Sequence, residues 1–223
     1  MKPIAAFTRT GDPAVPATVS INGRTSPVWL QKLWPEGPHT RYIRSNGCGH
    51  CCAVMAARLH GVGDIDPPTE YERCLTLWGE PDETHDHFIT ARGIVDVLRS
   101  FGVMAESFGV PTDAAGLAGV RGRIEAALSE GRQVIFWSHP TPRPDGNGTD
   151  NPFSTGEHYV MAVGYTADWQ ILIANSGNRV TSDGAQLCGM DTVMECLFKG
   201  CTAALTGWGV DNRLPDCGGV VIV

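Results

Sequence analysis

The amino-acid sequence predicts an α+β fold in which a helical first half precedes a strand-rich second half. Segments with helical apolar spacing and helix-end signals lie between about 41 and 131, whereas runs of β-branched and aromatic residues dominate from about 132 to 223. With 223 residues, 42% of them hydrophobic, the chain is long enough to bury a core as one domain over 1–223. We therefore expect a helical lobe packed on a sheet lobe.

Residues 1–40 are rich in Pro, Gly and Thr and show no sustained apolar period. They predict an irregular N-terminal arm with one short helix around "PVWLQKLW". No continuous apolar stretch follows Lys2, so the sequence as it stands predicts no signal peptide, although a signal that had been removed would leave no trace.

Four helices are expected in the first half. The first covers 49–60, contains no proline, and has Cys48 at its N-terminal end. The second begins with the capping-box pattern "TEYE" and covers 69–78. The third follows Thr90 as its cap and carries apolar residues at helical spacing, and the fourth covers 120–130.

Four strands are expected in the second half. They cover 133–138, 158–165, 170–176 and the C-terminal "GGVVIV". The long segment 139–157 between the first two is full of Pro, Gly and Asn, and loops of this length are usually functional. We expect it to line a substrate cleft.

Charge and composition exclude several classes of function. The formal net charge is −7 and the 17 Lys and Arg residues are scattered, so no basic surface for nucleic acid is expected. No apolar run has the length of a membrane span, so no membrane partner is expected. Several of the eight cysteines lie in apolar helical segments, which is typical of buried thiols in a reducing compartment such as the cytoplasm. A secreted mature form stays possible.

The stretch "SNGCGHCCAVMAARLHG" holds three cysteines within five residues and allows three interpretations. Cys48 and Cys51 form the Cys-x-x-Cys spacing of a dithiol oxidoreductase, but the preceding "GPHTRYIRSNG" is not the buried strand that a thioredoxin fold requires. The same pair could hold a metal, but no second cysteine pair has ligand spacing, and His85-Asp86-His87 is the other ligand-like cluster. Third, Cys48 could be a single nucleophile.

The nucleophile interpretation explains more of the sequence. A thiol at a helix N-terminus gains from the partial positive charge there, and it needs an imidazole and a polar group that orients the imidazole. His158 begins one predicted strand and Asn175 ends the next. A hairpin loop of two or four residues would place both on one face within reach of each other, whereas a loop of three residues would separate them.

These residues resemble a known family. "NGCGHCCAVMAARLHG", "GRQVIFWS" and "GEHYVMAVGY…ILIANS" are similar to segments of the papain-like cysteine peptidases, in particular the bacterial branch that includes the double-glycine leader peptidases of bacteriocin transporters and their free-standing relatives. The resemblance covers roughly 46–177. It implies a papain-like fold with an antiparallel sheet, a peptide or protein substrate and no cofactor or metal, with Cys48 as nucleophile, His158 as general base and acid, and Asn175 as the orienting group.

The resemblance departs from the family pattern before the nucleophile. The branch usually has a Gln six or seven residues earlier, which donates to the oxyanion, but Arg41 and Tyr42 occupy these positions here. Gln31 or Asn46 could take this role. The same triad would serve an acyltransferase, amidase or transglutaminase-like enzyme, and a degenerate member that only binds peptides is a further alternative.

Overall fold

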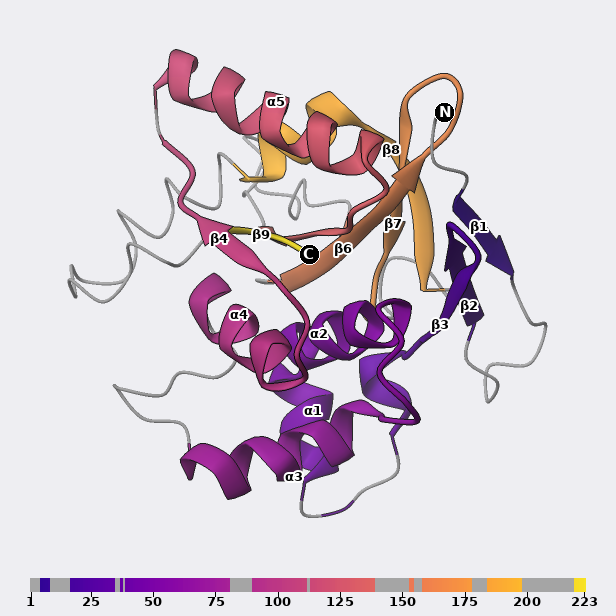
Figure 1. Ribbon diagram of the computed structural model, residues 1–223, viewed down its shortest axis with the longest axis vertical. Coiled ribbons are helices and arrows are strands. Elements are labelled where there is room, and N and C mark those ends of the chain that lie inside the picture. The colour runs from indigo at the N-terminus through magenta and orange to yellow at the C-terminus, as the bar shows by residue number, and fades with distance from the viewer. Residues whose placement is uncertain are drawn as a thin grey trace, which may run out of the picture.

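The computed structural model describes residues 5–8, 17–34, 37, 39–80, 90–111, 113–138, 153–154, 158–177, 184–197 and 219–223. Over these residues the fold is α+β, with two sheets in which all neighbouring strands are antiparallel. Figure 1 shows the larger sheet between α5 on one side and α1–α4 on the other. The helices are α1 Thr40–Asn46, α2 Cys48–Leu59, α3 Pro67–Trp78, α4 Ala91–Ser100 and α5 Ala114–Ser129.

The larger sheet has the strand order β4-β9-β5-β6-β7-β8. Its central strands β5 and β6 are buried along their whole length, which is why they read in the sequence as continuous apolar runs rather than as alternating ones. The six strands are β4 Glu106–Phe108, β5 Val134–Ser138, β6 His158–Tyr165, β7 Gln170–Ala174, β8 Ala185–Gly189 and β9 Val220–Ile222.

Two apolar clusters cover the two faces of this sheet. On one face, α2 and α4 pack against residues such as Met161 and Val221. On the other face, α5 and a helical segment over 190–197 pack against residues such as Phe136 and Val160. Successive residues of a strand point to opposite faces, so each strand contributes to both clusters.

The predicted helices and strands are present, with two differences in helix ends, whereas α1, β4, β8 and the helical segment over 190–197 were not predicted. The N-cap of α3 is Asp66, whose side chain accepts a hydrogen bond from the Thr69 N–H at 2.8 Å, so α3 begins before the predicted capping box. Asp113 caps α5 in the same way, and this helix begins six residues earlier than predicted. The Thr90 cap of α4 is present as expected.

The expectation of an irregular arm over residues 1–40 is wrong for the described part of this segment. Strands β1 Ala5–Thr8, β2 Ala17–Ile21 and β3 Arg24–Val28 form a small antiparallel sheet, followed by the 3₁₀ helix η1 Gln31–Leu33. Alternate residues of β2 are buried, and β3 packs on α2. The strands are short and polar on one side, so their pairing and contact with the core, rather than a local pattern, stabilise them.

Candidate active site

Cys48 is the first residue of α2, the most deeply buried helix of the described chain. The helix is joined to α1 through Gly47, which makes a close approach that excludes any side chain. A Cβ at this position would lie 2.6 Å from both the Cα and the carbonyl oxygen of Ile43. The half-buried Cys48 therefore stands at the end of a rigid helix, where partial positive charge favours a thiolate.

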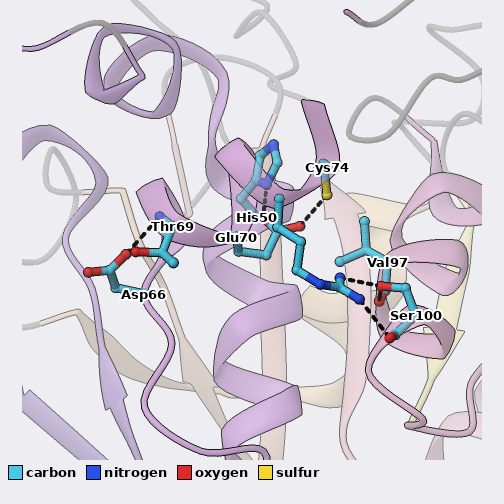
Figure 2. A network of polar contacts seen from close by, with 8 residues as sticks. His50, Asp66, Thr69, Glu70, Cys74, Val97 and Ser100 are labelled. Atoms are coloured by element: carbon cyan, nitrogen blue, oxygen red, sulfur yellow. Dashed lines mark hydrogen bonds and ion pairs between the residues drawn. The ribbon is translucent and has the colours of Figure 1, made fainter. Parts of the chain in front are cut away.

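A buried polar cluster holds the first turns of α2 and α3 together (Figure 2). The His50 Nδ1 atom is hydrogen-bonded to Glu70 Oε2, and both side chains are fully buried. The Cys74 thiol donates to the other Glu70 oxygen at 2.7 Å. Because buried polar groups are costly without partners, this cluster requires one relative placement of the two helices and so fixes the start of α2.

A β-bulge sets the register between β6 and β7. Next to their connecting loop, Gly164 pairs with Leu172, but Ala162 pairs with Ile173, so Val163 is an extra residue in β6. A shift of one residue exchanges the two faces of a strand. The bulge therefore determines which side chains of the first half of β6 lie on the same face of the sheet as a given side chain of β7.

The bulge brings His158 and Asn175 to the same side. The loop over 166–169 has four residues, one of the two lengths that were expected to place both side chains on one face. The strand pairing next to this loop, continued without the bulge, would nevertheless place them on opposite faces. Beyond the bulge, the register puts Val160 across from Asn175 and leaves His158 diagonal to it. Their side chains are hydrogen-bonded, with 2.8 Å between His158 Nε2 and Asn175 Oδ1.

The partners of Asn175 determine which nitrogen of His158 carries the proton. Asn175 Oδ1 also accepts from the Gly177 N–H at 2.8 Å, and Asn175 Nδ2 donates to the Phe153 carbonyl at 2.9 Å. A backbone N–H can only donate and a carbonyl can only accept, so the amide has one possible orientation. Its oxygen faces His158, so Nε2–H is the donor and the neutral ring keeps a basic lone pair on Nδ1.

His158 is buried, and burial lowers its pKa to about 4, an effect that the hydrogen bond to Asn175 partly offsets. The ring is therefore neutral at pH 7. A neutral imidazole with Nε2 fixed by an amide oxygen is the form that can accept a proton on Nδ1.

Gly177 lies directly against this histidine–asparagine pair. A Cβ at residue 177 would stand 3.0 Å from His158 Nε2 and 3.1 Å from Asn175 Oδ1. The importance of this glycine comes from a contact across two strands, which the order of residues does not display.

The first turn of α2 lies at the same end of the sheet as this pair. The Cys51 side chain, one turn after Cys48, lies beside Ser176, the residue that follows Asn175. The helix also packs against β6, which begins with His158. Among the described residues, neither His158 nor Asn175 is hydrogen-bonded to Cys48, so the helix packing is what brings the thiol to this end of the sheet.

The two candidate oxyanion residues differ in their surroundings. Gln31 is buried, its backbone N–H donates to the Ser176 carbonyl at 2.9 Å, and its side-chain Nε2 donates to the Arg44 carbonyl in α1 at 3.4 Å. Asn46 is exposed at the end of α1, and its side chain donates to the Ser45 hydroxyl. Gln31 therefore lies between α1 and the strand end that carries Asn175.

Several expectations concern residues outside the described ranges or sites that the described residues do not form. His85-Asp86-His87 and most of the segment 139–157 lie outside the described residues. Within those residues, no group of three His, Cys, Asp or Glu side chains is arranged to hold a metal ion. None of the described helices has the length and apolar character needed to cross a membrane.

The described cysteines differ in burial and in the pKa of their thiols. Each of the six is a thiol, and four of them, Cys51, Cys52, Cys74 and Cys196, are buried. Burial raises the pKa of Cys51, Cys52 and Cys74 above its ordinary value. Burial also raises the pKa of Cys188 to about 12, so this half-buried thiol is a poor nucleophile at neutral pH.

No family model matches the sequence, and a search of curated proteins finds no match.

Proposed function

We propose that this protein is a papain-like cysteine peptidase that uses Cys48, His158 and Asn175. The observation that carries the proposal is the His158–Asn175 hydrogen bond at the ends of two adjacent strands, at the sheet end where the first turn of α2 lies. An imidazole whose Nε2–H is fixed by an amide oxygen has its other nitrogen available for a nucleophile. A nearby cysteine at a helix N-terminus is suited to be that nucleophile.

The proposed reaction follows from these roles. Nδ1 of His158 takes the proton of the Cys48 thiol as the sulfur attacks the carbonyl carbon of a peptide bond. The resulting oxyanion accepts hydrogen bonds from the Cys48 N–H and the Gln31 side-chain amide. The C–N bond then breaks as His158 protonates the leaving amine, which leaves a thioester on Cys48. A water molecule, deprotonated by His158, releases the acid product and restores the thiol.

The alternatives use different parts of the same region. An acyltransferase or transglutaminase-like enzyme would need the same three residues and would differ only in the acceptor of the acyl group. A thiol–disulfide oxidoreductase would need Cys48 and Cys51 but has no use for the His158–Asn175 pair. The chain reaches Cys48 from helix α1 through Gly47 and not from a strand. A thioredoxin-like enzyme has a strand before its first cysteine, so this also favours the peptidase.

The test uses activity against a complex mixture of peptides. Cleavage is detected as new N-termini by mass spectrometry, and kcat/KM is then measured on the best peptide found. We expect Cys48→Ala and His158→Ala to abolish cleavage, and Asn175→Ala to lower kcat/KM by roughly 10- to 100-fold, because the ring is no longer held. Cys52→Ala is the matched control, since it removes a neighbouring thiol of the same helix.

The outcomes separate the proposals. Loss of activity in both Cys48→Ser and Cys51→Ser would favour the dithiol enzyme, whereas loss in Cys48→Ser alone supports the peptidase. Addition of a primary amine distinguishes hydrolysis from acyl transfer, because an acyltransferase would form the amide product in preference to the acid. Iodoacetamide at neutral pH should label Cys48 first. Preferential labelling of Cys188 in the folded protein would contradict the proposal.

A further inference from the structure

We propose that Cys48 and Cys51 form a reversible disulfide that switches off the nucleophile when a peroxide is present, and that Cys51 is the residue that resolves the oxidised form of Cys48. The inference rests on the proposed role of Cys48 as the reactive thiol. It assigns a chemical role to the Cys-x-x-Cys spacing that the peptidase mechanism leaves unused.

The geometry of the helix start carries this inference. Cys48 and Cys51 both lie in the first turn of α2, three residues apart. At this spacing the Cα atoms of a helix are roughly 5 Å apart, within the range that a disulfide spans. Cys48 follows Gly47, whose backbone (φ −81°, ψ 16°) lies outside the regular helical range, so Cys48 is the terminal residue of the helix and not an interior one.

The exposure of the three neighbouring thiols sets the order of events. Cys48 is half-buried, whereas Cys51 and Cys52 are both fully buried. A peroxide dissolved in water therefore reaches Cys48 first, and Cys51 reacts only with an oxidised Cys48 beside it. Cys48 is close enough to raise the pKa of both neighbouring thiols by charge repulsion, second only to burial.

Cys51 is better placed than Cys52 to be the partner. Cys52 is one residue further along α2, where the Cα separation from Cys48 is roughly 6 Å. Cys51 also has the Ser176 side chain beside its thiol, and burial raises the pKa of both Cys51 and Cys52. Attack by Cys51 therefore depends on its closeness to the oxidised sulfur of Cys48, and its proton leaves as the S–S bond forms.

Each step balances. The Cys48 thiolate attacks one oxygen of a hydroperoxide, the O–O bond breaks, and sulfenic acid forms while the peroxide is reduced to water or an alcohol. The Cys51 sulfur then attacks the sulfenic sulfur, its proton and the hydroxyl leave as water, and the S–S bond forms. A dithiol reductant restores both thiols by exchange. Without Cys51, further peroxide would convert Cys48 to sulfinic acid, which reductants do not reverse.

The test follows the three thiols in one peptide, because trypsin cleaves after Arg44 and Arg58 and so releases Cys48, Cys51 and Cys52 together. The folded full chain is treated with hydrogen peroxide, unfolded and alkylated. We expect the peptide from untreated protein to carry three alkyl groups and that from oxidised protein to carry one, located on Cys52. An alkyl group on Cys51, with Cys48 joined to Cys52, would overturn the proposal.

Reversibility is tested with matched variants. After peroxide and then dithiothreitol, the wild type and Cys52→Ala should regain iodoacetamide labelling at Cys48, whereas Cys51→Ala should regain roughly tenfold less and carry sulfinic acid. Equal recovery in Cys51→Ala would refute the proposal. Cys51→Ser gives a second variant if the alanine form does not fold, and circular dichroism checks both. Because these readouts follow sulfur chemistry alone, they stand or fall separately from peptidase activity.

Discussion

Gly177→Ala should slow the reaction by displacing the histidine without removing any catalytic group. The added Cβ would lie 3.0 Å from His158 Nε2, 3.3 Å from Cε1 of the same ring and 3.1 Å from Asn175 Oδ1. Ordinary contacts begin near 3.4 Å, so the ring must retreat by about 0.4 Å. The Gly177 N–H is kept by alanine, so its hydrogen bond to Asn175 can remain.

The expected loss follows from this displacement. A misplacement of about 1 Å can cost roughly 100-fold in rate, so about 0.4 Å predicts a fall in kcat/KM of roughly 5- to 10-fold, or about 1 kcal/mol. The stability should change by less than about 1 kcal/mol, because the contact is relieved by a small movement and alanine reduces the freedom of the unfolded chain.

The assay compares Gly177→Ala with Gly63→Ala. A Cβ at Gly63 meets nothing within 4 Å, so this variant controls for the loss of a glycine. Both are measured for kcat/KM on the same peptide and for the rate of Cys48 alkylation by iodoacetamide, which needs no substrate. A folded Gly177→Ala protein with unchanged values of both would refute the claim that this contact positions the imidazole.

Three further predictions concern stability and the oxyanion. Because burial lowers the pKa of His158 to about 4, the unfolded chain takes up a proton between about pH 6.5 and 4 that the folded chain does not, so roughly 3 kcal/mol of stability is lost on acidification over this range. Urea unfolding at both pH values should show a loss that is smaller by about this amount in His158→Gln than in the wild type, because other groups such as His60, whose pKa burial also lowers, titrate in both proteins. Equal losses would contradict the burial argument. Glu70→Gln should lower the free energy of unfolding by roughly 2–3 kcal/mol, because it disturbs the buried hydrogen bond to His50. A change below about 0.5 kcal/mol, measured by urea unfolding, would show that this cluster does not hold the two helices together. Gln31→Ala should lower kcat roughly 100-fold if its amide binds the oxyanion, whereas Asn46→Ala, at an exposed position, should leave steady-state kinetics unchanged; the reverse result would exchange the two roles.

The sequence by itself determined the local elements of this protein. Apolar spacing and a Thr90 cap were enough to place α4, and the run of β-branched and aromatic residues over 158–165 defined β6 to the residue. The helix that begins at Cys48 could also be read, because the segment has strong helix formers and glycines after its end. These features depend on neighbours a few residues apart, which the sequence displays directly.

The tertiary structure decided what those elements bring together. Loop length alone could not place His158 beside Asn175, because a bulge at Val163 corrects the register within a strand whose pattern gives no sign of it. The small sheet formed by β1, β2 and β3 was missed for a related reason, since its short strands are stabilised by pairing and by packing on α2 rather than by local propensity.

The same reason applies to the supporting contacts around the candidate site. The approach of Gly177 to the imidazole and the burial of Glu70 against His50 join residues that are 19 or 20 positions apart. Such contacts depend on how whole strands and helices pack, and packing is a property of the complete fold. Local preferences determined which elements exist, and only their mutual burial determined the geometry on which the proposed chemistry depends.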